Sequence, residues 1–382
     1  MPTILHSARR LRPTILVRLA LTALMLAAVG RHYAPGAGFS RLLQLSEDGH
    51  ATETTALRGV PHYHYPPGQV YDAQSYVQMA LYPLLKNPEL ELALDAPQYR
   101  SRRILFAWTA WLAGLGRPAW VVQAYALQNV LFWLALAWWL TRRYPADDWR
   151  GLAIWIAVMF SHGLLSSVRL ALLDGPSLLL IAIAISWAER GRPLASAALV
   201  GVAGLGRETN LLAAAGLRWR FGRDRLSLVR LALSAALVAV PILLWMDYLR
   251  SIYRTTVLVM GSQMTWPLSA YLQQWQQLWR ALGGSLGSHI GSALALIALS
   301  TQAIFLLSRA QAGSLWWRVG FVNALLMLVI GVDVWAGDPG AATRVLLPMT
   351  LSFNLLLPRT RAFWPLFAAG NLTVLLAWRA MA

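Results

Sequence analysis

The sequence predicts an all-α protein that crosses a membrane many times and forms a single domain over residues 1–382. Of the 382 residues, 57% are hydrophobic and only 13% are charged, and the mean hydropathy is +0.50. Apolar stretches that approach the about 20 residues of a membrane helix recur from the N-terminus almost to the last residue. This composition excludes a soluble globular fold.

The charge pattern and the absence of cysteine exclude further classes of function. The formal net charge is +17, but the arginines lie in short clusters between apolar stretches rather than in a basic stripe, so nucleic-acid binding is not expected. The chain has no cysteine, which excludes disulfides, thiolate catalysis and thiolate metal sites.

The first expected span is Ile15–Val29, and Arg9, Arg10 and Arg12 precede it. Arginines before a first span favour a cytoplasmic N-terminus. A cleaved signal peptide is the alternative, which the long apolar run and the weak cleavage pattern disfavour. Residues 31–103 follow as a long outer, periplasmic loop that holds seven of the sixteen acidic residues.

The later elements are oriented by arginine clusters at 142–143, 190–192, 218–225 and 359–361, which we expect to be cytoplasmic. Residues 104–115 are expected as a short helix on or in the outer face, broken at 116–118. The chain then has roughly eleven helices that cross or enter the bilayer, and the shortest are half-helices that face a polar cavity. The remaining expected helices are 119–140, 152–168, 176–188, 194–205, 210–217, 228–248, 290–307, 317–335, 345–357 and 363–378, with a second outer loop at 250–289.

This orientation places every candidate polar site at the outer face, which favours a single active site. The residues concerned are Asp72, Arg169 with Asp174, Arg207 with Glu208, and Asp338 with Arg344.

Asp72 is the candidate catalytic carboxylate. It follows a segment rich in proline and glycine, residues 62–68, which favours a fixed extended loop. A carboxylate held at the membrane surface can take the proton from a hydroxyl group. The alternative is a helix N-cap, since a helix is expected over residues 73–85.

Arginines supply the candidate anion contacts. Where the loop meets the membrane stand three arginines, Arg100, Arg102 and Arg103. A planar guanidinium group can donate hydrogen bonds to two phosphate oxygens at once. The alternatives are contact with lipid headgroups, or pairing with Glu89, Glu91 and Asp95.

The other polar turns allow two interpretations each. Arg169 and Asp174 could form a structural ion pair, with Asp174 capping the next helix. Arg207 and Glu208 lie in an apolar stretch, where ionisable groups face a cavity or each other. For this pair we favour a role in substrate contact over a purely structural one. Arg344 at a helix start favours a bound anion. Asp338 is interpreted as a turn residue.

Four of the seven histidines fall in the first outer loop, at positions 32, 50, 62 and 64. His62 and His64 could contribute to a metal site, but loop histidines beside tyrosines more often form hydrogen bonds. We therefore expect no metal and no cofactor.

Three segments resemble one bacterial family of the GT-C superfamily of membrane glycosyltransferases, a family linked to cell-surface glycopolymer formation. They are residues 71–76 (Tyr-Asp-Ala-Gln-Ser-Tyr), 79–83 (Met-Ala-Leu-Tyr-Pro) and 97–105 (Pro-Gln-Tyr-Arg-Ser-Arg-Arg-Ile-Leu). The family typically has Asp-Gly-Gln where this chain has Ala73. Residues 206–209 resemble its Arg-Glu-Thr signature. Residues 169–176 resemble a turn of protein O-mannosyltransferases and lipid A aminoarabinose transferases. The resemblance covers residues 13–217.

The resemblance implies an inverting glycosyltransferase that moves a sugar from a polyprenyl-phosphate donor to a lipid-linked, glycan or protein acceptor at the outer face of a bacterial inner membrane. It implies Asp72 as the base and Asp174 as a second acid. The residues expected to contact substrate are Gln74, Tyr76, Arg100, Arg103, Arg169, Arg207, Glu208, Arg344 and His64. A transporter or flippase, or a polymerase, for lipid-linked saccharides is the alternative function, and a non-catalytic scaffold is a third.

Overall fold

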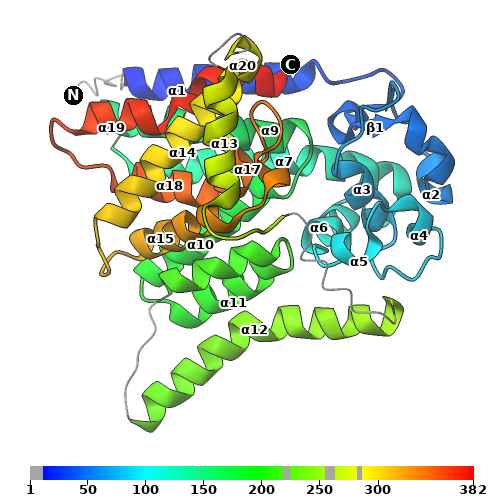
Figure 1. The fold of residues 1–382 in the computed structure, drawn as a ribbon. Coiled ribbons are helices and arrows are strands. Elements are labelled where there is room, and N and C mark those ends of the chain that lie inside the picture. Colours follow the sequence, from blue (N-terminus) through cyan, green and yellow to red (C-terminus); the bar gives the residue numbers. More distant parts are fainter. Residues whose placement is uncertain (1–11, 146, 218–223, 254–262, 282–285) are drawn as a thin grey trace, which may run out of the picture.

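The computed structural model describes residues 12–145, 147–217, 224–253, 263–281 and 286–382, and this part of the chain is almost wholly helical (Figure 1). In the described part, the only named strands are β1 (Leu45–Ser46) and β2 (His64–Tyr65), which pair in parallel. The predicted all-α class is confirmed. Arg9, Arg10, most of the 218–225 cluster, and residues 254–262 and 282–285 of the second predicted loop lie outside the described residues.

Four of the described helical segments are long and apolar enough to cross a membrane. These are α1 (Pro13–Gly30), α7 (Pro118–Arg143), α12 (Arg225–Tyr253) and the segment Gly287–Ser308, which contains α14 (Ile290–Ser308). A fifth is counted if α8 (Trp149–Met159) and α9 (His162–Arg169), bent by 46°, form one span. The chain is thus suited to a membrane, and the larger number of about eleven helices stays a prediction.

The other helices are shorter. In the first loop region, residues 31–103, they are η1 (Ser40–Leu43), η2 (Glu47–Thr52), α2 (Thr55–Arg58), α3 (Ala73–Leu81), α4 (Leu90–Ala93) and α5 (Pro97–Arg100). Beyond it they are α6 (Leu105–Ala113), α10 (Asp174–Glu189), α11 (Pro193–Gly204), η3 (Glu208–Gly216), α13 (Ser269–Ala281), η4 (Leu286–His289), α15 (Leu315–Val329), α16 (Val332–Trp335), α17 (Ala342–Val345), α18 (Leu347–Leu356), α19 (Phe363–Gly370), η5 (Leu372–Leu376) and α20 (Ala377–Met381).

Three of the expected membrane helices are interrupted in the structure. The expected helix 152–168 bends at Ser161, whose backbone is extended. The expected helix 317–335 ends at Val329, because residues 263–268 bond to its end: Thr265 N–H donates to Val329 O at 2.9 Å. The expected helix 363–378 is interrupted at Asn371, whose side-chain amide exchanges two hydrogen bonds with that of Asn354.

The first loop region gathers at one end of the helical bundle, drawn in blue to cyan in Figure 1. The C-terminal part of α12 contacts it: Trp245 donates from Nε1 to the carbonyl of Ser101 at 2.9 Å, and Tyr248 donates to the carbonyl of Leu84 at 2.7 Å. The helix expected over residues 104–115 is present as α6, and the turn at residues 114–117 separates it from α7. The loop region is therefore fixed against the bundle rather than hanging from it.

Candidate functional site

A polar cavity of about 150 Å³ lies where the first loop region meets the ends of several bundle helices. Five of its polar residues belong to the first loop region and the others to the bundle and to the segment after α12. The polar lining consists of Asp72, Tyr76, Tyr99, Arg100, Arg103, Asp174, Arg207, Gln263, Asp333 and Arg344. We call this space the arginine cavity. Residues separated by up to 272 positions in the chain thus meet at one place.

Asp72 lies immediately before α3 but does not cap it. Its backbone has helical angles and its side chain accepts no hydrogen bond from the helix start. Instead, Asp72 Oδ1 accepts a hydrogen bond from Arg100 Nη2 at 2.8 Å, while the Asp72 side chain stays 37% exposed. The ion pair holds the carboxylate in place and leaves part of it open to a ligand in the arginine cavity.

Asp95 holds Arg100 from the other side. Arg100 donates from Nε and Nη2 to the two carboxylate oxygens of Asp95 at 2.9 and 2.6 Å. Partial burial raises the pKa of Asp95, but hydrogen bonds from Arg100 and Ser75 lower it by more, so the pKa lies below its usual value. Asp95 is therefore charged at neutral pH, and Arg100 is fixed between two carboxylates.

Arg103 joins the loop region to the bundle. It donates from Nε to Glu208 at 3.0 Å, and Glu208 begins η3. Its other nitrogens donate to the hydroxyl groups of Tyr76 and Tyr99 at 3.3 and 2.5 Å, and its guanidinium carbon lies 4.3 Å from the centre of the Tyr99 ring. Cation–π stacking and hydrogen bonds together fix this guanidinium group at the cavity wall.

Asp174 is buried between two arginines. Only 5% of its side chain is exposed, and its two oxygens accept hydrogen bonds from Arg207 and from Arg344 Nη1, the latter at 3.3 Å. Arg169 and Asp174 do not form the ion pair that was one of the two interpretations of this turn. Arg169 ends α9 and donates to the Tyr65 hydroxyl and the Arg41 carbonyl at 3.1 and 3.3 Å, because the turn at residues 170–173 separates it from the start of α10.

A second cavity of about 490 Å³ adjoins the first. Asp333 and Arg344 line both, and Arg169 and Tyr71 line only the second. The Tyr71 hydroxyl accepts a hydrogen bond from Arg344 Nη2 at 2.6 Å. Consecutive residues, Tyr71 and Asp72, therefore line different cavities, and Arg344 forms part of the wall between them.

Gly163 allows α9 to approach Arg344 closely, which leads to a prediction. A Cβ atom at Gly163 would overlap the carbonyl group of Thr343, next to Arg344. Gly163→Ala is therefore expected to lower stability by about 1–3 kcal/mol, the usual cost of overpacking. The measurement is the thermal unfolding midpoint in detergent. Gly30→Ala is the control, since nothing lies within 4 Å of a Cβ added there, and an equal midpoint for both variants would contradict the prediction.

Three residues predicted to contact substrate, Gln74, His64 and Glu208, line neither of these two cavities, and Glu208 instead contacts Arg103 of the cavity wall. Gln74 packs against residues 46–49 and accepts a hydrogen bond from Ser46 N–H at 3.4 Å. His64 faces Glu53 and His62. Gln74 does not line the arginine cavity because α3 turns position 74 away from the side that carries Tyr76. The expected contacts of these residues with substrate stay predictions.

Asp338 is held at another turn of the bundle. Its carboxylate accepts a hydrogen bond from Ser292 N–H at 2.5 Å and pairs with Arg379 at 3.1 Å. These contacts agree with its interpretation as a turn residue. Sequence reasoning did not single out Tyr71 or Asp333, although Tyr71 adjoins Asp72 and Asp333 is an ionisable residue in an apolar stretch, which is a recognised signal of a cavity.

Comparisons with protein-family models, with curated proteins and with solved structures found no match. Function is therefore inferred from the two cavities and the residues that line them.

Proposed function

We propose that the protein is an inverting membrane glycosyltransferase of the GT-C type. It moves a sugar from a polyprenyl-phosphate donor to an acceptor hydroxyl at the outer face of a bacterial inner membrane. The observation that carries the proposal is the arginine cavity itself, in which four arginines and Asp72 meet between a polar loop region and apolar helices. The apolar helices suit a lipid carrier, and the cavity suits its charged head.

The four arginines, at positions 100, 103, 207 and 344, are the groups that bind the donor phosphate in this proposal. Each is held by a carboxylate, so its guanidinium group needs little ordering when a ligand arrives. Arg207 keeps a spare donor, because its buried Nε has no hydrogen-bond partner among the described residues. Phosphate oxygens accept such N–H groups in charge-assisted hydrogen bonds.

Asp72 acts as the general base. Its carboxylate takes the proton of the acceptor hydroxyl, the hydroxyl oxygen forms a bond to the anomeric carbon of the sugar, and the bond from that carbon to the phosphate oxygen breaks. The leaving polyprenyl phosphate keeps the electron pair, and the arginines stabilise its charge. Asp174 keeps Arg207 and Arg344 in place for this step.

The two adjoining cavities support transfer between two ligands. The arginine cavity would take the donor phosphate, and the larger cavity, which contains His162 and Arg169, would take the acceptor. Arg344 contacts Asp174 on one side and Tyr71 on the other. A group passed from one cavity to the other would therefore move past Asp72 and Arg344.

A transporter or flippase for lipid-linked saccharides is the rival, and one observation favours it. All four arginines of the cavity are ion-paired, and paired charges at a cavity are also what a closed gate would have. A transporter moves its substrate unchanged, whereas a transferase leaves a free polyprenyl phosphate and a longer glycan.

The experiment is a mass-spectrometric profile of lipid-linked sugars and surface glycans in cells with the protein and in cells without it. The proposal expects a polyprenyl-phosphate sugar to accumulate in cells without the protein, while one sugar unit disappears from a surface glycan. Purified protein in detergent, supplied with that donor and with glycan acceptor from the cells that lack the protein, should then release polyprenyl phosphate although no second compartment exists. Identical profiles, or a donor that purified protein leaves intact, would contradict transfer.

A further inference from the structure

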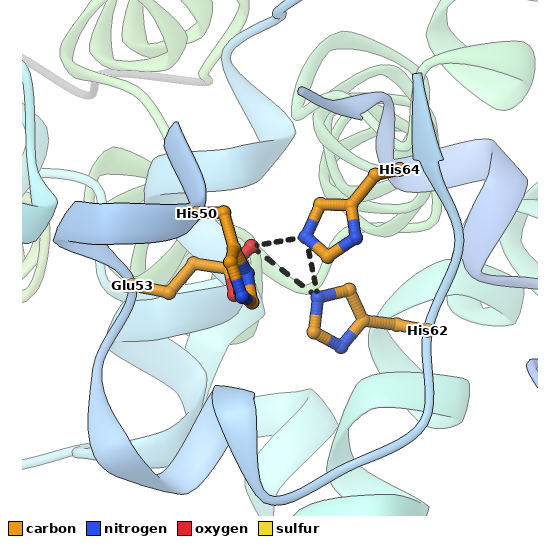
Figure 2. Close-up of side chains that lie close together, drawn as sticks. All are labelled: His50, Glu53, His62 and His64. Atoms are coloured by element: carbon orange, nitrogen blue, oxygen red, sulfur yellow. Dashed lines mark hydrogen bonds and ion pairs between the residues drawn. The ribbon is translucent and has the colours of Figure 1, made fainter. Parts of the chain in front are cut away.

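Three histidines and one glutamate of the first loop region lie close together (Figure 2). They are His50, Glu53, His62 and His64, and their ligand atoms all lie within 4.8 Å of one another. His50 lies in η2 and Glu53 follows its last residue, while His64 begins β2 and His62 lies two residues before it. None of the four lines either cavity described above.

The distances between these atoms resemble those of a tetrahedral site. His62 Nε2 lies 3.0 Å from His64 Nε2, and Glu53 Oε1 lies 3.3 Å from the first and 2.8 Å from the second. His50 Nδ1 lies 3.0 Å from Glu53 Oε2. Ligands about 2.1 Å from a zinc ion at tetrahedral angles are about 3.4 Å apart, so small side-chain rotations would bring all four to one ion.

The surroundings of His62 fit a metal ligand. Its Nδ1 lies 2.6 Å from the carbonyl oxygen of Val60, to which it donates. This hydrogen bond places the lone pair of a neutral ring on Nε2, the atom that faces His64 and Glu53. Histidines that bind metals commonly donate their other ring N–H to a backbone carbonyl in this way.

The cluster is buried on the side of Glu53 and His62 and open to solvent on the side of His50. The side chain of Glu53 is 0% exposed and that of His62 is 3% exposed, whereas that of His50 is 58% exposed. A buried carboxylate surrounded by imidazoles needs a positive charge beside it. The exposed side at His50 gives an ion a path from solvent.

We propose that His50, Glu53, His62 and His64 bind one divalent transition-metal ion of the zinc class. Three imidazole nitrogens and one carboxylate oxygen are ligands that Zn²⁺ accepts, and with four protein ligands the site is a closed, structural one. The proposal does not depend on the proposed transfer reaction, because it rests on a separate set of side chains.

The ion would link η2 to β2 and hold this part of the loop region against α3. Gln78 of α3 accepts a hydrogen bond from Thr54 N–H at 2.8 Å, and Gln74 accepts one from Ser46 N–H at 3.4 Å. The residues around the site thus contact the helix that begins directly after Asp72. Metal binding is expected to stabilise the folded loop region, since an ion that binds only the folded state shifts unfolding to higher temperature.

The competing explanation is a hydrogen-bonded cluster without metal, in which a proton on His62 or His64 pairs with Glu53. The two explanations differ in what happens when a metal is offered. A hydrogen-bonded cluster gains nothing from zinc, whereas a metal site binds it in a fixed ratio and loses it when a ligand is removed.

The experiment uses the full-length protein in detergent, without a polyhistidine tag, stripped with a chelator and then equilibrated with Zn²⁺. We expect one zinc ion per chain by elemental mass spectrometry, and a higher thermal unfolding midpoint with zinc than without it. Co²⁺ in place of zinc should give the strong visible absorption of a tetrahedral site. The absence of cysteine means that this spectrum would come from nitrogen and oxygen ligands alone.

Matched variants decide the assignment. His62→Ala and Glu53→Gln should each lose the bound zinc, the cobalt spectrum and the zinc-dependent rise in midpoint. His50→Asn, at the exposed ligand, should weaken binding in a chain that still folds. His289→Ala removes an exposed histidine outside the cluster and should keep all three signals. Zinc absent from the native protein, or kept by His62→Ala and Glu53→Gln, would overturn the proposal.

Discussion

Asp72→Asn is expected to lower sugar transfer by about a hundred- to ten-thousandfold, the usual contribution of a general base. Asparagine keeps the shape of the side chain and can still accept a hydrogen bond from Arg100, which Asp95 continues to hold. It cannot take a proton from the acceptor hydroxyl. The variant should therefore fold and bind the donor but turn it over slowly.

The measurement is the release of polyprenyl phosphate by purified protein, together with the surface glycan profile of cells that make the variant. Glu47→Gln is the control, since it removes an exposed carboxylate of the same loop region and should leave the rate unchanged. An Asp72→Asn protein with native turnover would remove Asp72 from the mechanism. If the protein is a transporter, this variant should bind the lipid-linked saccharide more weakly or couple its binding less well to transport, and the saccharide would stay chemically intact.

The sequence indicated that the ionisable residues of one apolar stretch face a cavity or other charged groups. Arg207 and Glu208 lie in an apolar stretch, where unpaired charge is costly, and the structure places Arg207 against Asp174 and Glu208 against Arg103. Hydropathy also located α1, α7 and α14 to within a few residues, because long apolar helices follow from composition and length. These features depend on local sequence or on the high cost of burying charge.

Other features depend on contacts that the sequence does not show. Arg169 lies five residues before Asp174, yet the turn between them sends its side chain to Tyr65. The end of α15 at Val329 depends on hydrogen bonds from residues 263–268. The histidine cluster combines His50-x-x-Glu53 with His62-x-His64, and only the pairing of β1 with β2 and the course of η2 bring the two pairs together. In the sequence only His62 and His64 stand close enough to suggest a shared metal, and a pair of ligands is weak evidence for one.

Asp174→Asn is expected to destabilise the protein by about 3–5 kcal/mol, because removing one member of a buried ion pair leaves its partners without compensation. The carboxylate is 5% exposed and accepts hydrogen bonds from both Arg207 and Arg344. Asparagine fits the same space but carries no charge, so two guanidinium groups would face each other across a neutral amide. The expected result is a large fall in the thermal unfolding midpoint, measured by tryptophan fluorescence in detergent.

Two further variants test whether the loss of stability comes from buried guanidinium groups left without a carboxylate partner. Asp147→Asn removes a carboxylate that is 68% exposed and pairs with Arg12, so its expected effect is below about 1 kcal/mol. Adding Arg207→Met to Asp174→Asn removes one of the two unpaired guanidinium groups and should restore part of the lost stability. If the two residues acted independently, the losses of stability from the two substitutions would add. If Asp174→Asn is as stable as Asp147→Asn, or if the double variant is less stable than Asp174→Asn, Asp174 does not hold the two arginines in place. The arginine cavity would then depend on other contacts for its shape.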